Sequence, residues 1–199
     1  MKLYYSATSP YVRKVVASAM AVGLEGRITR VETNPHGSPP GLLADNPLSK
    51  VPCLVTDDGL ALFGSPVICE YLDAVGEGAL FPPPGPLRWR ALKLQAIGDG
   101  MMDAAVMRRM EQGRPAEDAR TANMDRQAAA VARSLDVLEA APPAGHLDIG
   151  TITVACALGY LDLRFADDRW RDGHPILAAW YAGMAARPEI AGTAPPQVV

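Results

Sequence analysis

The sequence is poor in cysteine, histidine and aromatic residues, and these shortages argue against several classes of protein. Its 199 residues include three cysteines and three histidines, and aromatic residues make up 6%. The cysteines, Cys53, Cys69 and Cys156, form no CxxC pair and have no metal-binding spacing. Such a sparse, odd set suits a reducing compartment better than a disulfide scaffold. We therefore expect a cytoplasmic protein without a metal ion.

The net charge is small, and long apolar runs are absent. The 19 Lys and Arg against 22 Asp and Glu give a net charge of −3, whereas nucleic-acid-binding domains are normally basic. No uninterrupted apolar run approaches the ~20 residues that span a bilayer. Residues 1–6 lack the apolar core of a secretory signal. We expect neither a nucleic-acid partner nor a membrane partner. Hydrophobic residues, at 49%, suffice for a sizeable core.

Proline and glycine, 18 of each, mark a boundary in the chain. Residues 77–86 read Glu-Gly-Ala-Leu-Phe-Pro-Pro-Pro-Gly-Pro. Proline lacks an N–H donor and fixes φ, so this segment cannot be a helix or a central strand. We interpret it as a semi-rigid linker between a domain of residues 1–76 and a domain of residues 87–199.

The patterns on the two sides of this linker differ. Before it, hydrophobic periodicity predicts four strands and two helices in mixed order, with a hairpin turn at Asp57-Asp58-Gly59. The strands are expected at 2–5, 27–32, 53–56 and 60–63, and the helices at 11–22 and 66–75. After the linker only helical patterns occur, at 87–112, 115–141, 152–165 and 176–187. The third of these is unusually apolar and poor in charge, which predicts a buried central helix. The predicted fold class is α+β, with a mixed-sheet domain followed by an all-helical domain.

Ser9 is a candidate anion-binding residue at the start of the first predicted helix. It precedes Pro10, which suits the first helical position, so Ser9 fits an N-cap. Free backbone N–H groups and the helix dipole favour an anion there, to which Ser9 can donate its own proton. The simpler alternative is that Ser9 only caps the helix. The neighbouring Thr8 also has a hydroxyl and could donate to the anion instead.

Two further segments should lie on the same sheet edge as Ser9. In Lys50-Val51-Pro52, a cis-proline would turn a backbone amide outward to pair with an extended ligand, although trans is the default isomer and Lys50 alone suggests a solvated charge. After Gly64, Ser65 heads a predicted helix and can hold a carboxylate. A plain N-cap is the alternative for Ser65.

These segments carry a resemblance to a known family. Thr-Ser-Pro-Tyr-Val-Arg-Lys at 8–14, Asn-Pro-Leu-Ser-Lys-Val-Pro-Cys-Leu at 46–54 and Ser-Pro-Val-Ile-Cys-Glu-Tyr-Leu at 65–72 resemble a glutathione S-transferase. Residues 99–104, 155–162 and 187–196 resemble a bacterial branch of that superfamily, so the likeness covers nearly the whole chain. It implies a thioredoxin-like, glutathione-binding first domain, an all-helical second domain and a homodimer.

The resemblance also implies roles for individual residues. Ser9 matches the serine that donates a hydrogen bond to the glutathione sulfur. The main chain of Val51 matches the partner of the cysteinyl part, and Pro52 matches the family's cis-proline. Ser65 matches the residue that grips the γ-glutamyl carboxylate, and Lys50 a position often near the glycyl carboxylate.

Two positions depart from the family pattern. Gly64 stands where an acidic residue or glutamine usually helps to recognise the γ-glutamyl amine. Asp99 and Asp103, reaching across a dimer interface, could take the place of this side chain. The simpler interpretation is that both are solvated charges on a helix. The buried helix often begins with a Ser/Thr-x-x-Asp capping box, but Thr151 is followed by Val154, which cannot cap.

The implied activity is conjugation of the glutathione thiol to a small hydrophobic electrophile, as in detoxification. One alternative, which the Gly64 departure favours, is a binding or scaffold protein with little turnover. The other, a glutathione-dependent thiol-disulfide reductase, needs a cysteine at the Ser9 position, where there is none.

Overall fold

The chain forms two compact units. The computed structural model describes residues 1–76, 78–115 and 117–196. Residues Met1–Arg88 together with the C-terminal residues from Pro188 make the first unit, and Trp89–Arg187 make the second. Residue 77, where the predicted linker begins, lies outside the described residues, and so do the last three residues. The domain boundaries that we expect from the sequence stay predictions.

A four-stranded mixed sheet forms the centre of the first unit. Its strands are β1 (Lys2–Tyr5), β2 (Thr29–Glu32), β3 (Cys53–Val55) and β4 (Ala61–Phe63), in the order β2-β1-β3-β4. β1 and β2 are parallel, whereas β3 is antiparallel to both β1 and β4. The predicted hairpin is present and has Gly59 at φ 88°, a left-handed conformation that glycine adopts readily.

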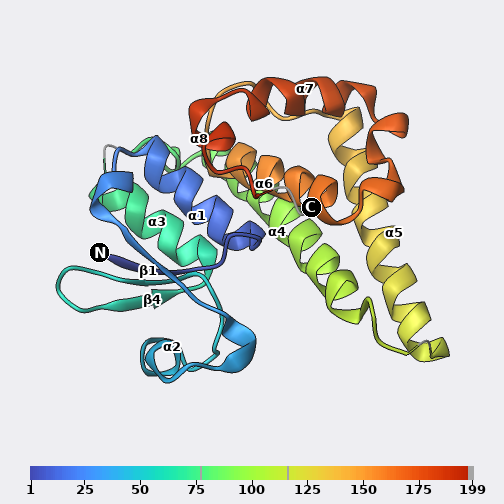
Figure 1. Cartoon of the computed structure of the whole chain (residues 1–199). Coiled ribbons are helices and arrows are strands. Elements are labelled where there is room, and N and C mark those ends of the chain that lie inside the picture. Colours follow the sequence, from blue (N-terminus) through green and yellow to red (C-terminus); the bar gives the residue numbers. More distant parts are fainter. Residues whose placement is uncertain (77, 116, 197–199) are drawn as a thin grey trace. The chain divides into compact units, whose positions relative to one another are not determined.

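Helices cover both faces of this sheet, which is the thioredoxin-like arrangement that we expect. α1 (Pro10–Ala21) and α3 (Ser65–Val75) pack against each other on one face, and α2 (Pro40–Asp45) lies on the other (Figure 1). Successive side chains of a strand point to opposite faces. Accordingly, Tyr4 packs with Leu42 of α2 and with Cys53. Leu3 is fully buried.

A short C-terminal helix completes the first unit. α8 (Pro188–Ala191) packs on α1, a helix that the sequence patterns do not predict. Arg13 of α1 is 8% exposed and donates from Nη2 to the carbonyl oxygen of Ile190 over 3.1 Å. This buried, charge-assisted contact ties the C-terminal residues to the first unit.

The second unit is all-helical. Its elements are α4 (Pro86–Glu111), which belongs to this unit from Trp89 onward, α5 (Asp118–Ala140), α6 (Ile149–Arg164) and α7 (Pro175–Ala185), with 3₁₀ turns η3 (Ala166–Asp168) and η4 (Trp170–Gly173). Every residue of α6 from Ile149 to Leu161 is buried, which confirms the expectation of a buried helix. A Cβ at Gly150 would lie 2.5 Å from the Ala91 carbonyl oxygen, so only glycine permits this close approach of α6 to α4.

The expectation about the start of α6 is wrong in two respects. The helix begins at Ile149 rather than near residue 152, and it has a capping box. Asp148 is the N-cap: its Oδ1 accepts the Thr151 N–H over 2.8 Å, and Thr151 Oγ1 accepts the Asp148 N–H over 2.8 Å. The acid is therefore at the N-cap and the hydroxyl at the third helical position, the reverse of the order sought in the sequence.

Within the residues described, no single helix is both apolar enough and long enough to cross a membrane. Taken together, α6 and the 3₁₀ segment of residues 166–173 are long and apolar enough, but the chain bends by 100° between them, and the match rests on length and composition only.

We expect Asp148→Ala to lower the free energy of unfolding by about 1–2 kcal/mol, because the buried N–H of Thr151 in the first turn of α6 loses its side-chain acceptor. Chemical denaturation followed by far-UV circular dichroism measures this change. Asp148→Asn keeps a capping oxygen and should lose much less. Equal losses in the two variants would contradict the capping role.

Candidate functional site

Strand register brings the three segments singled out in the sequence to one edge of the sheet. Tyr4 pairs with Cys53, and Cys53 pairs with Phe63. Neighbouring strands lie ~4.8 Å apart. The loop after β1, the loop before β3 and the turn after β4 therefore leave the same edge within about 10 Å of one another. α1 and α3 both begin at this edge, so the positive ends of their dipoles are close to it.

Ser9 caps α1, as expected. Its backbone is extended, with φ −79° and ψ 121°, and its Oγ accepts the Val12 N–H over 3.3 Å. Pro10 is the first helical residue. Because Oγ acts as the acceptor in this contact, the Ser9 hydroxyl keeps its proton for another partner. Ser9 and Thr8 are both partly exposed.

The Val51–Pro52 peptide bond is cis. Pro52 is buried, Val51 is half-buried and Lys50 is exposed at this edge. The segment directly precedes β3, whose first residue, Cys53, is completely buried. The main chain of Val51 therefore lies at the end of β3, which is one of the two central strands of the sheet.

Ser65 is not the N-cap of α3, although we expect it to be. It is the first residue of α3, and Gly64 is the N-cap at φ 83°. Gly64 has no side chain, so the first turn of α3 receives no side-chain cap. The carbonyl oxygen of Gly64 accepts the Ile68 N–H over 3.1 Å. Ser65 is 4% exposed, whereas Gly64 is exposed.

The chain's own thiols are poor nucleophiles. Cys53, Cys69 and Cys156 form no disulfide, and all three are buried. Burial raises the pKa of the Cys53 thiol to about 11, so this cysteine is protonated at neutral pH although it follows Pro52 directly. A thiolate is the reactive form of sulfur. A reactive sulfur at this edge would therefore have to come from a bound molecule.

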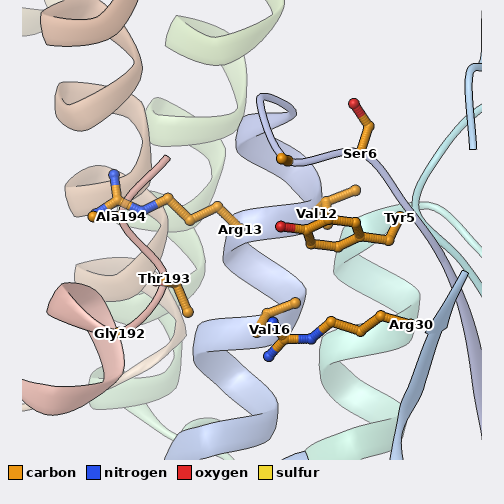
Figure 2. Close-up of a pocket in the computed structure, with 10 residues that line it drawn as sticks. Tyr5, Ser6, Val12, Arg13, Val16, Arg30, Gly192, Thr193 and Ala194 are labelled. Carbon is orange, nitrogen blue, oxygen red and sulfur yellow. The ribbon is translucent and has the colours of Figure 1, made fainter. Parts of the chain in front are cut away.

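A small cavity adjoins the end of β1 (Figure 2). Its volume is about 50 Å³, and its lining includes Tyr5, Arg13, Arg30 and Thr193. Ser9, Val51 and Ser65 are not among its lining residues.

Sequence reasoning did not single out Asn46. This residue is 1% exposed, and its side-chain amide makes two hydrogen bonds within the loop before Val51. The available signal was the Asn-Pro pair at residues 46 and 47, because asparagine side chains commonly bond backbone groups two residues further on.

Asp99 and Asp103 lie on α4, and neither is free of interactions. Their proposed part in ligand recognition stays a prediction. Among the described residues, no group of three or more His, Cys, Asp or Glu side chains could hold a metal ion.

Comparison with protein families gives two matches. Residues 8–75 match the model of the glutathione S-transferase N-terminal domain, and residues 121–183 match that of the C-terminal domain. The chain is also 36% identical over 203 residues to the uncharacterized GST-like protein YibF of Escherichia coli K12, covering 99% of this chain and 100% of that protein.

Solved structures give the same result. A glutathione transferase family member from Pseudomonas fluorescens Pf-5, with bound glutathione, is 42% identical, with a TM-score of 0.91 and 98% of each chain covered. The same protein with bound S-(propanoic acid)-glutathione gives a TM-score of 0.87 at 41% identity, covering 98% of this chain and 100% of that one.

A glutathione S-transferase from Methylobacillus flagellatus KT, with glutathione bound, is 33% identical, with a TM-score of 0.85 and coverage of 98% of this chain and 99% of that one. Both domain models match in order, and these likenesses extend over nearly the whole chain. The chain therefore belongs to the glutathione S-transferase superfamily.

Proposed function

We propose that the chain is a glutathione transferase that activates the glutathione thiol and conjugates it to a small hydrophobic electrophile. The observation that carries the proposal is the convergence of Ser9, Val51 and Ser65 on one sheet edge, where two helices begin. The relatives from Pseudomonas fluorescens and Methylobacillus flagellatus were solved with glutathione bound, which supports the same ligand here.

Each site residue has a role in this proposal. The Ser9 hydroxyl donates to the glutathione sulfur, and the main chain of Val51, before cis-Pro52, pairs with the cysteinyl unit as an added strand would. Ser65 holds the γ-glutamyl carboxylate through its hydroxyl and the N–H groups of the first turn of α3. Lys50 lies near the glycyl carboxylate.

The chemistry is thiol activation followed by substitution. A free cysteine thiol has a pKa near 8.5, so little of it is thiolate at neutral pH. A hydrogen bond from Ser9 and the N-terminus of α1 stabilise the thiolate, and each unit of pKa lowering corresponds to about 1.4 kcal/mol. The thiol proton passes to solvent. The thiolate then forms a sulfur–carbon bond with the electrophile as the leaving group departs with its electron pair.

Further parts of the proposal follow from family membership. The protein would act as a homodimer in the cytoplasm. The Pseudomonas fluorescens relative also bound S-(propanoic acid)-glutathione. In that compound the sulfur carries a carbon substituent, as it would in the conjugates proposed for this chain.

One observation favours a second candidate function. Gly64 leaves the γ-glutamyl amine without the acidic or amide side chain that the family usually provides at this position. A glutathione-binding or scaffold protein with little turnover would tolerate that loss. The reductase alternative is weaker, because the described cysteines are buried and none occupies position 9.

We expect the purified protein to be retained on immobilised glutathione and to conjugate glutathione to a generic aryl halide. The absorbance of the thioether product measures the conjugation. Retention without conjugation would favour the scaffold function. Absence of both would overturn the proposal.

We expect Ser9→Ala to lower kcat about 10- to 100-fold with a smaller change in glutathione affinity, because a hydrogen bond to a charged group contributes about 1.5–3 kcal/mol. Its pH–rate profile should shift to higher pH, since the thiol loses the donor that stabilises its ionised form. Thr8→Ala is the matched control. Loss of turnover in Thr8→Ala with normal Ser9→Ala kinetics would move the role by one residue.

We expect Ser65→Ala to raise the KM for glutathione about tenfold while kcat at saturation changes little. The carboxylate contact is the same in the ground state and in the transition state, so its loss weakens binding uniformly. Steady-state kinetics with varied glutathione measures this split. A fall in kcat with unchanged KM would place Ser65 elsewhere in the mechanism.

A further inference from the structure

We propose that Asn46 is a positioning residue that turns the N–H of Val51 toward the bound ligand. This inference rests on the proposed function, in which the main chain of Val51 pairs with glutathione. Asn46 directly follows α2, and its own N–H donates to the carbonyl oxygen of Leu42 over 2.7 Å. The residue is therefore anchored to the helix on the opposite side of the sheet from α1 and α3 (Figure 1).

The side-chain amide of Asn46 holds the loop that leads to the site. Its Nδ2 donates to the carbonyl oxygen of Lys50 over 2.8 Å, and its Oδ1 accepts the Leu48 N–H over 3.0 Å. The main chain contributes a third contact, because the Ser49 N–H donates to the Asn46 carbonyl oxygen over 3.0 Å. With 1% of the residue exposed, water competes little for these bonds.

The contact with Lys50 sets the direction of the Val51 N–H. The carbonyl of Lys50 and the N–H of Val51 belong to one peptide group, which is planar and trans, since the cis bond is the one after Val51. In a trans peptide the C=O and N–H bonds point in opposite directions. Because Asn46 holds the carbonyl toward the inside of the loop, the N–H faces away from it.

Ser49 holds the same loop from a second side. It adopts φ 50°, the left-handed region, which costs an L-residue roughly 1–2 kcal/mol. Its Oγ lies 3.1 Å from the Pro35 carbonyl oxygen and 3.1 Å from Ser38 Oγ, which links the loop to the 3₁₀ turn η2 (Pro35–Gly37) and the residue after it. An unfavourable conformation persists where its surroundings determine it, so the loop is held rather than free to adapt.

The test compares Asn46→Asp and Asn46→Ala with the wild type. Asn46→Asp keeps the shape and the acceptor for Leu48 but replaces the donor to Lys50 with a carboxylate oxygen. We expect both variants to raise the Kd for glutathione, measured by titration calorimetry, and the KM for glutathione about tenfold, the effect of one misplaced hydrogen bond. The kcat at saturating glutathione should change less than threefold.

Tyr4→Phe is the matched control on the same side of the sheet. The Tyr4 hydroxyl lies 2.7 Å from the Gly41 carbonyl oxygen and 2.7 Å from Asp45 Oδ2. Its removal weakens the attachment of α2 without touching the loop after Asn46. We expect Tyr4→Phe to lower the thermal midpoint and to leave both Kd and KM for glutathione at their wild-type values.

A second readout needs no ligand. In the unliganded protein we expect the Val51 amide signal in a ¹⁵N–¹H spectrum to shift or broaden in both Asn46 variants and to stay in place in Tyr4→Phe. Asn46 variants with lower thermal midpoints but unchanged Kd, KM and Val51 signal would show a merely structural role and overturn the inference. If the wild type binds no glutathione, the proposed function fails, and the Val51 signal alone decides whether Asn46 orients this peptide.

Discussion

The antiparallel pairing of β3 with β1 and β4 is the constraint on which the candidate site depends. Cys53 pairs with Tyr4 on one side and with Phe63 on the other. That row of the sheet aligns three chain segments far apart in sequence. A shift of one residue in this register would move every side chain of β3 to the opposite face, removing Cys53 from its buried contact with Tyr4 and Leu42. The burial of Cys53 and the assembly of the site are therefore consequences of the same pairing.

The same burial makes the thiol of Cys53 an unsuitable nucleophile. A cysteine lies next to Pro52, yet the hydrophobic surroundings raise the pKa of its thiol to about 11. The hydroxyl groups of the partly exposed Thr8 and Ser9 and the N–H groups at the starts of α1 and α3 are suited to stabilise negative charge. Gly64 has no side chain, so the N–H groups in the first turn of α3 receive no side-chain cap. A site of this kind is suited to hold and activate an anionic sulfur that arrives with a cosubstrate.

In the second unit, one helix organises the packing. α6 is buried from Ile149 to Leu161 and approaches α4 so closely that a side chain at Gly150 has no space. The capping box formed by Asp148 and Thr151 satisfies the N–H groups where this buried helix begins. Apolar composition alone identified the helix as buried. It did not identify where the helix begins, because the cap lies in a polar stretch before the apolar run and has the acid and the hydroxyl in reversed positions.

Local patterns were sufficient to predict the individual strands, the hairpin at Gly59, the N-cap at Ser9 and the helical second part, because each depends on residues within a few positions of one another. The resemblance to glutathione S-transferases was visible in short motifs for the same reason. Tertiary structure decided the cis form of the Val51–Pro52 bond, the place of Ser65 inside α3 rather than before it, the burial of Arg13 against Ile190 and the contacts of Asn46. Peptide isomer, burial and side-chain partners depend on atoms that folding brings together from distant parts of the chain, and no local pattern records them.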